Sequence, residues 1–324
     1  MNPGDLPLRT GAPSLPVDAK FAADVIAGLS KAGKELPCRW FYDARGSELF
    51  EEITRLPEYY PTRTEAAILT RHAAEIGRRT APGSVLVEFG SGSSRKTEIV
   101  LKAMPQLAAY VPIDVSPSAL AEARTRLAHR FPQLQVLPVV GDFLAEPRLP
   151  ADLRLAPRLG FFPGSTIGNL PPEDACSLLK HFGKTLRGGS RLVIGVDLRK
   201  AADLLAPAYD DRRGVTAAFN LNLLHRINRE LGGDFDLESF AHEAVWNDAD
   251  SRIEMRLVSL RPQTAYVLGR RFGFGEGERI HTENSYKHTI EGFRALAEEA
   301  GWRALVTWTD DEDLFSVHEF AWAA

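Results

Sequence analysis

The stretch from Val85 to Lys96, which reads VLVEFGSGSSRK, constrains the fold of this chain more than any other part. An apolar segment ends there, and Gly90 and Gly92 then lead into a predicted helix. Glycines at such a corner let the backbone approach a ligand closely, with helix N–H groups directed at it. Asp114 closes the next apolar segment, at a spacing that suits a carboxylate accepting hydrogen bonds from ribose hydroxyls. We therefore expect a ligand that contains adenosine.

The missing third glycine narrows the choice of ligand. The dinucleotide fingerprint has a glycine three residues after the second one, where this chain has Arg95. S-Adenosylmethionine has no phosphates to hold, and the sequence from Glu88 to Ser93 resembles the first motif of class I methyltransferases. After a third apolar segment, Asp142 is expected to face the adenine edge. The residues that we expect to bind S-adenosylmethionine are Glu88, Gly90, Ser91, Gly92, Ser93, Lys96, Asp114, Asp142 and Phe143.

Strand and helix patterns alternate between residues 84 and 198. The predicted strands are 85–89, 109–114, 135–141, 158–163 and 190–197, and the predicted helices are 94–104, 117–130 and 172–186. Such alternation implies a parallel sheet with helices on both faces. Ligands of these sheets bind outside the carboxyl ends of the strands, which is where Gly90, Asp114, Asp142 and Gly164 fall.

The pattern changes between residues 200 and 286. A long helix is predicted at 215–230, and period-2 alternation predicts antiparallel strands at 241–246, 253–260 and 263–272. The α/β pattern returns with a helix at 289–301 and strands at 304–310 and 314–322, an ending that is typical of class I methyltransferase sheets.

We therefore predict an α/β protein with a class I, Rossmann-like methyltransferase core and a second, α+β domain. The core is assigned to residues 63–199 and 287–324, and the substrate-binding domain to 17–62 and 200–286. The substrate-binding domain includes a segment dense in aromatic residues, with helices predicted at 19–32 and 47–56; a further helix is predicted at 64–76. Residues 1–16, with their prolines and glycines, are expected to form a loose tail.

Composition excludes several classes of partner. A net charge of −4 argues against nucleic acid, which normally requires a basic face. No apolar run approaches the ~20 residues that cross a bilayer, and the first residues lack the features of a signal peptide. The two cysteines, Cys38 and Cys176, have no metal or disulfide spacing, and neither do the histidines. We expect a cytoplasmic monomer without a bound metal, acting on a small molecule rather than on nucleic acid or a membrane.

Six blocks of the chain together resemble the histidine-specific methyltransferase family. They are RWFYDARGS (39–47), TRLPEYYPTRTE (54–65), GSTIGNL (164–170), YDD (209–211), GVTAAFN (214–220) and IHTENSYK (280–287). The resemblance implies S-adenosylmethionine-dependent trimethylation of the α-amino group of L-histidine. The product would be hercynine, in the first step of ergothioneine biosynthesis.

The resemblance also implies which residues hold the amino acid. Asn169 and Tyr209 match residues that clasp the amino and carboxylate groups, and Gly164 and Thr166 belong to the same loop as Asn169. Glu283 and Ser285 match the imidazole-binding pair, and Met255 matches a residue that lines the imidazole site.

Two residues apart in an extended segment, Glu283 and Ser285 share a face and can reach one ring. Because Glu283 favours a protonated ring, it is expected to select histidine over neutral aromatic analogues.

Aromatic residues near the N-terminus suit a substrate that becomes a permanent cation. A ring face stabilises such a nitrogen by roughly 0.5–2 kcal/mol. We expect Tyr42 and Phe50 to surround the amine and Tyr59 to lie nearer the imidazole. Methyl transfer chiefly requires an aligned, desolvated lone pair, so Asn169 and Tyr42 are the expected catalytic residues, with Tyr42 at most assisting proton removal.

Three alternatives remain at this point. A nucleic-acid methyltransferase would carry an aromatic residue after Asn-Pro-Pro, whereas this chain reads Asn169-Leu-Pro-Pro-Glu173. A catalytically silent adenosine-binding module would bind the donor without turnover. Within the family, the substrate could be a different amino acid, such as tryptophan or a thiolated histidine.

Overall fold

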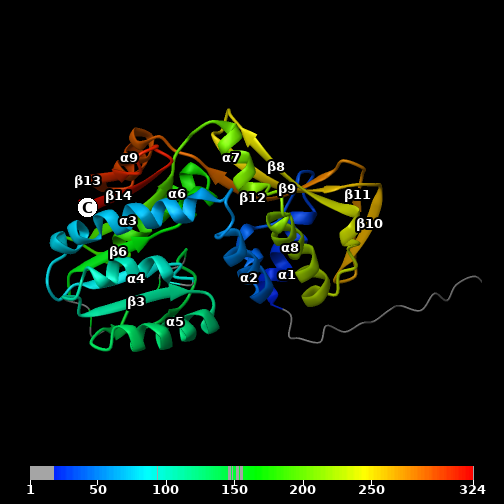
Figure 1. The fold of residues 1–324 in the computed structure, drawn as a ribbon. Coiled ribbons are helices and arrows are strands. Elements are labelled where there is room, and N and C mark those ends of the chain that lie inside the picture. The colour runs from blue at the N-terminus through cyan, green and yellow to red at the C-terminus, as the bar shows by residue number, and fades with distance from the viewer. Residues whose placement is uncertain are drawn as a thin grey trace, which may run out of the picture. The chain divides into compact units, whose positions relative to one another are not determined.

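The computed structural model describes residues 18–92, 94–144, 147, 149–150, 153 and 156–323. The expected tail at 1–16 and the expected donor ligand Ser93 lie outside these described residues. The chain divides into two compact units, each built from separate segments (Figure 1). Unit 1 comprises Met1–Tyr59, Ala202–Asn247 and Ile253–Asn284, and unit 2 comprises Tyr60–Ala201, Asp248–Arg252 and Ser285–Ala324.

Unit 2 contains one large sheet with the strand order β13-β14-β7-β6-β2-β3-β4, and β5 pairs with β3. Its strands are β2 (Val85–Phe89), β3 (Ala109–Asp114), β4 (Gln135–Val136), β5 (Val139–Val140), β6 (Arg158–Phe162), β7 (Arg191–Asp197), β13 (Trp302–Thr309) and β14 (Phe315–Trp322). The neighbouring strands β4, β3, β2, β6 and β7 pair in parallel, whereas β14 runs antiparallel to both β7 and β13. The predicted class I, Rossmann-like core is confirmed.

Helices cover both faces of this sheet (Figure 1). They are α3 (Tyr60–Arg79), α4 (Arg95–Lys102), α5 (Pro117–Arg130), α6 (Pro172–Leu186) and α9 (Ile290–Glu299). Successive strand residues point to opposite faces, so Val85 and Val87 pack with α6 and α9, while Leu86 packs with α3 and α4. A strand buried on both faces must be apolar throughout, which explains the continuous apolar runs of the sequence.

The prediction of a single strand at 135–141 is wrong. The structure has two short strands there, β4 and β5, which both pair with β3 on either side of Leu137 and Pro138. Proline has no N–H to give to the ladder, so the pairing stops at Pro138 and resumes after it.

Unit 1 combines helices with two small sheets. Its helical elements are α1 (Ala19–Leu29), η1 (Cys38–Phe41), α2 (Ala44–Ile53), α7 (Ala202–Tyr209), α8 (Val215–Leu231) and η4 (Leu237–Ser239). The four-stranded sheet has the order β1-β12-β9-β8, formed by β1 (Lys34–Glu35), β12 (Arg279–Tyr286), β9 (Arg252–Ser259) and β8 (Phe240–Asn247). The first residue of β9 and the last two residues of β12 are counted in unit 2. The predicted α+β domain is thus present.

The second sheet of unit 1 corrects another expectation. The segment 263–272 was expected to be one strand, but it is a hairpin of β10 (Gln263–Val267) and β11 (Arg270–Phe274). Leu268 and Gly269 form the turn with φ values of 48° and 74°. Two successive residues with positive φ give a turn whose twist matches that of antiparallel hairpins. The sequence does not indicate this turn, because leucine rarely adopts a positive φ. Across the described ranges, no helix combines the length and the apolar composition that a membrane crossing requires.

Candidate active site

The glycine corner of unit 2 lies at the carboxyl end of β2. Gly90 and Gly92 both have positive φ, at 71° and 45°, and a Cβ on Gly90 would come within 3.1 Å of the Phe143 ring. The Asp114 carboxylate accepts hydrogen bonds from the backbone N–H groups of Gly92 (2.9 Å) and Ser116 (3.0 Å). Each carboxylate oxygen has two lone pairs, so Asp114 can hold the corner and still accept from ribose hydroxyls.

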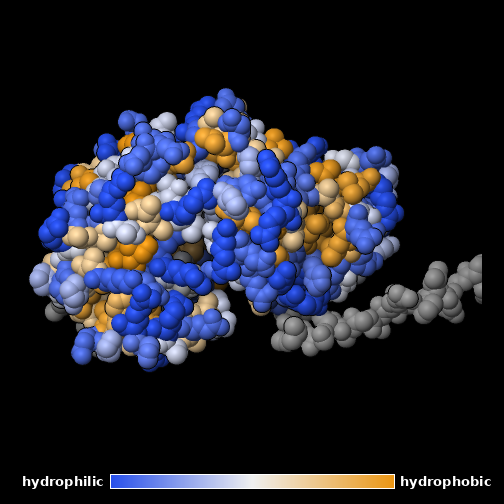
Figure 2. All heavy atoms as spheres, viewed as in Figure 1, coloured by the Kyte–Doolittle hydropathy of each residue, from blue (hydrophilic) through white to orange (hydrophobic). Residues whose placement is uncertain are grey.

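Two further observations fit an adenosine ligand at this edge of the sheet. The Ser91 hydroxyl is buried and has no hydrogen-bond partner among the described residues, so a ligand group could satisfy it. Val115, Val140 and Leu144 are exposed apolar side chains at or just after the ends of β3 and β5. On the face that Figure 2 shows, hydrophilic residues predominate and apolar residues gather in several groups. Asp142, expected at the adenine edge, holds its own loop by accepting from the Leu144 N–H at 2.9 Å.

Glu88 is buried beneath the corner. Its carboxyl group contacts the Thr97 hydroxyl (2.7 and 2.8 Å) and the Tyr110 phenol, which belong to α4 and β3. Burial raises the pKa of Glu88 to about 8, against the opposing effect of these two hydrogen bonds. Its carboxyl group therefore holds α4 against the sheet in a neutral form at pH 7.

Lys96, an expected donor ligand, forms an ion pair with Glu65 of α3. Glu65 is 1% exposed and also accepts the backbone N–H of Gly164, at 3.0 and 2.9 Å from its two oxygens. Gly164 begins the loop that carries the expected substrate residues, so Glu65 joins the donor side of unit 2 to this loop. Sequence reasoning gave Glu65 no role, although it ends one of the six family blocks.

The loop after Gly164 is tightly fixed within unit 2. Ser165 adopts a left-handed conformation and its hydroxyl accepts the Asp197 N–H at 2.9 Å. The 3-10 helix η3 (Thr166–Asn169) follows and places Asn169 at its last position. A Cβ on Gly168 would lie 2.7 Å from the Tyr286 carbonyl oxygen, so only glycine permits this packing.

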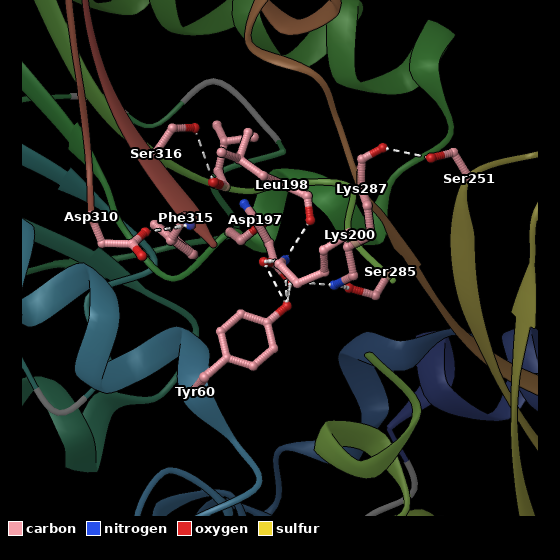
Figure 3. Close-up of polar contacts among 12 residues, drawn as sticks. Tyr60, Asp197, Leu198, Lys200, Ser251, Ser285, Lys287, Asp310, Phe315 and Ser316 are labelled. Atoms are coloured by element: carbon pink, nitrogen blue, oxygen red, sulfur yellow. Dashed lines mark hydrogen bonds and ion pairs between the residues drawn. The ribbon is translucent and has the colours of Figure 1, made fainter. Parts of the chain in front are cut away.

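A buried ion cluster surrounds Asp197 at the end of β7 (Figure 3). The Asp197 carboxylate contacts the Tyr60 phenol (2.8 Å to both oxygens), the Lys200 ammonium (2.7 Å) and the Lys287 ammonium (2.7 Å). Lys287 also donates to the hydroxyl of Ser285, an expected imidazole ligand, at 2.8 Å. Burial opposes ionisation of Asp197, but the two ammonium groups outweigh it and lower its pKa.

Unit 1 brings four of the expected aromatic residues into one group. Ring centroids are 5.6 Å apart for Tyr42 and Phe50, 6.3 Å for Phe50 and Tyr59, and 6.3 Å for Tyr59 and Tyr209. Phe219 of α8, which sequence reasoning missed, packs edge-on against Tyr42 at 5.7 Å and at a tilt against Phe50 at 6.0 Å. We call these five residues the aromatic group.

Glu283 of β12 lies beside this group. Burial and the negative charge of Glu283 raise the pKa of Tyr42 well above its usual range, and the same two causes raise the pKa of Cys38 to about 12. Because 39% of Tyr42 is exposed, the Glu283 carboxylate is the better-founded of the two causes for this residue. Met255 is buried on β9, the strand next to β12, and its carbonyl accepts the Thr282 hydroxyl at 3.0 Å.

Two polar residues hold the backbone of Tyr209. The Asn220 amide nitrogen lies 2.8 Å from His242 Nδ1, and His242 Nε2 lies 2.8 Å from the Tyr209 carbonyl oxygen. An amide nitrogen only donates, so Nδ1 accepts and Nε2 carries the proton; this tautomer is assigned from the network. Sequence reasoning gave neither Asn220 nor His242 a role.

Several known proteins are similar to this chain over most of its length. The model of a family described as histidine-specific methyltransferase, SAM-dependent, matches residues 21–322. The chain is 46% identical over 292 residues to a histidine N-alpha-methyltransferase of Mycolicibacterium smegmatis, covering 89% of this chain and 90% of the relative. It is 43% identical to a protein of the same name from Mycobacterium tuberculosis, covering 91% and 92%. Ergothioneine biosynthesis protein 1 of Neurospora crassa is 29% identical over 85% of this chain and 32% of that protein.

Proposed function

This chain belongs to the histidine-specific, S-adenosylmethionine-dependent methyltransferase family, and on that premise we propose that it trimethylates the α-amino group of L-histidine to give hercynine. One observation carries the choice of substrate. Glu283 is only 9% exposed and lies beside the aromatic group, where the charge of its carboxylate raises the pKa of Tyr42. Such a carboxylate can accept an imidazole N–H, and the aromatic rings can hold a nitrogen that gains charge.

The bound donor supplies a methyl group on a positively charged sulfur. The residues of this chain need to hold the amine lone pair in line with it and to keep water away. Asn169 can donate to the carboxylate of the amino acid and accept from its amine, because its side chain offers both kinds of group. Tyr209, fixed through its carbonyl by His242, is proposed to hold the same end of the substrate.

Tyr42 is proposed to orient the amine rather than to remove its proton. Its raised pKa means that the phenol keeps its own proton at neutral pH, so it is a poor base. An amino group of ordinary pKa loses its proton near neutral to mildly alkaline pH without a strong base. The faces of the aromatic group would then stabilise the methylated nitrogen, by roughly 0.5–2 kcal/mol for a well-placed ring.

We also propose that the enzyme works in the cytoplasm. Cys38 and Cys176 are both free thiols, which fits a reducing compartment.

Mass spectrometry tests the proposed reaction. The protein is incubated with S-adenosylmethionine and all standard amino acids, and the expected product is histidine with three added methyl groups, with no other amino acid modified. An Asp114→Ala variant is the control for the donor, because it loses the carboxylate that shapes the glycine corner. Methylation of tryptophan instead would identify a different substrate. Donor binding without turnover on any amino acid would indicate a silent adenosine-binding module.

A further inference from the structure

The side chain of Lys287 is completely buried within unit 2. Its ammonium group lies 2.8 Å from the Ser285 hydroxyl and 2.7 Å from the Asp197 carboxylate (Figure 3). An ammonium group has three hydrogens and no lone pair, so it donates in both contacts. The Ser285 oxygen therefore accepts from Lys287, and the hydroxyl hydrogen of Ser285 points away from this ammonium group.

The surroundings of Lys287 hold a second ammonium group, that of Lys200, and a second carboxylate, that of Asp310, which acts on Lys200. Asp197 balances one ammonium group, but both Lys287 and Lys200 contact it. Burial lowers the pKa of Lys200 to about 8, so this second ammonium group is present below pH 7. His288, next in sequence, adds no charge above pH 5, because burial and then the Lys287 charge lower its pKa to about 4.

On the other side of Ser285 along β12 lies Glu283. Both residues, with His281, fall on one face of the strand by the alternation of extended backbone. The titratable groups that face Glu283 within unit 1 include Cys38 and Tyr42, which both stay neutral at neutral pH because their pKa values are raised. Glu283 and Ser285 are the expected imidazole ligands. A negative charge therefore lies at Glu283, and the positive charge of the Lys287 ammonium group lies next to Ser285.

We infer that Lys287 makes this enzyme bind the imidazole of histidine in its neutral form, by fixing Ser285 as a hydrogen-bond donor to the unprotonated ring nitrogen. Glu283 accepts the N–H of the other nitrogen. This inference rests on the proposed function, and it reverses the expectation from sequence that Glu283 favours a protonated ring. Lys287 is a positioning residue, since it acts on the substrate through Ser285.

Charge and geometry point the same way. A ring nitrogen that bonds to Ser285 would lie about 5 Å from the Lys287 ammonium, given hydrogen bonds of about 2.8 Å on both sides of the hydroxyl. A like charge at ~4–6 Å disfavours a protonated ring. A protonated ring would also offer an N–H to an oxygen that already accepts from an ammonium group.

The protonation state of the bound ring can be read directly. Hercynine labelled with ¹⁵N in the ring is bound to the full-length protein together with S-adenosylhomocysteine, and ¹⁵N spectra are recorded between pH 5 and 7. A neutral ring shows one protonated and one unprotonated nitrogen, whereas an imidazolium shows two protonated ones. The trimethylated amine of hercynine cannot titrate, so the ring is the titrating group of the ligand in this range.

In the wild-type protein we expect the bound ring to titrate at least one pH unit lower than free hercynine. Below the pKa of the free ring, hercynine affinity should then fall about tenfold per pH unit. A bound ring that is protonated where free hercynine is neutral would overturn the inference without any variant.

Lys287→Met assigns the effect to Lys287. The bound ring should titrate at least one unit higher than in the wild type, because Glu283 is no longer opposed. Lys200→Met is the matched control, since Lys200 contacts the same Asp197 but donates its other hydrogen bonds to the Tyr60 hydroxyl and the Leu198 carbonyl, and it should shift the ring by much less. Equal shifts in both variants would refute the role of Lys287. If Lys287→Met does not fold, Lys287→Gln removes the charge but keeps a donor, and it should still raise the ring pKa.

Failure of the proposed function would look different. In that case hercynine would not bind and histidine would not be methylated, and the inference would fall with it.

Discussion

Replacing Glu88 by glutamine tests whether the buried carboxyl group beneath the glycine corner is neutral at pH 7. Glu88 accepts from the Tyr110 phenol, and both of its oxygens lie within 2.8 Å of the Thr97 hydroxyl, to which a protonated carboxyl group can donate. A glutamine offers an amide donor and a carbonyl acceptor in the same places. Because Glu88 has a pKa of about 8, the wild-type side chain is neutral at pH 7, and Glu88→Gln should preserve both the fold and donor binding.

The magnitude follows from the difference between the folded and unfolded pKa of Glu88. The group titrates near 4.5 when unfolded and near 8 in the structure. Between these values the folded protein keeps a proton that the unfolded chain has lost. The stability that Glu88 contributes is therefore complete below about pH 4.5 and is lost as pH rises to about 8. Each pH unit in this window changes the free energy of unfolding by about 1.4 kcal/mol, with an upper bound of about 5 kcal/mol in all.

Hydrogen–deuterium exchange of peptides covering β2 and β3 is the appropriate assay. A chain with two compact units need not unfold in one step, so a local measurement is needed. Opening free energies of wild type and Glu88→Gln are compared at pH 5, 6, 7 and 8. The wild type should lose stability relative to the variant by about 1.4 kcal/mol per unit. Glu122→Gln, which changes an exposed carboxylate of α5, controls for general charge effects.

A difference between wild type and Glu88→Gln that stays constant from pH 5 to 8 would refute the argument. It would mean that Glu88 is already ionised in the folded protein, and that its contacts stabilise a carboxylate rather than a neutral acid.

Three more predictions concern the substrate side and the loop anchor. Tyr42→Phe should keep much of its activity at mildly alkaline pH, where the amine is already deprotonated, and near-complete loss in a pH–rate series would make Tyr42 the base. Glu283→Ala should lower kcat/KM for histidine and reduce its preference over tryptophan in a competition assay, and an unchanged preference would remove Glu283 from imidazole recognition. In Gly195→Ala the new Cβ would lie 2.0 Å from Glu65 Oε1, so overpacking should cost about 1–3 kcal/mol and lower the Tm. Gly188→Ala, with open space around the added carbon, should leave the Tm nearly unchanged, and equal losses in both variants would contradict the reasoning.

The sequence predicted the elements of unit 2 with strong local signals. The strand at 85–89 and the helix at 117–130 have the limits that were expected. The strand is apolar because both its faces are buried, and the helix starts at the Ser116 cap with Pro117 in its first position. At Pro138 and at the Leu268 turn, an apolar or alternating pattern continues through a position where the strand ends. The sequence therefore predicted one strand where the structure has two.

The candidate site was predicted unevenly for a different reason. The aromatic residues and Glu283 were found through the family blocks, and the structure brings several of them together within unit 1. Glu65 and His242 were not found, because each acts on a backbone group far away in the sequence. No spacing rule relates Glu65 to Gly164, and only the tertiary structure pairs them.

The position of β14 has a consequence for synthesis on the ribosome. This strand is translated after every other strand of the large sheet, yet it lies between β7 and β13. A nascent chain that has not reached Phe315 leaves one side of β7 without its neighbour, and β13 has no partner to receive it. Exposed strand edges of this kind pair readily with other chains. We therefore expect the large sheet to remain incomplete until β14 has been synthesised and can pair with both β7 and β13.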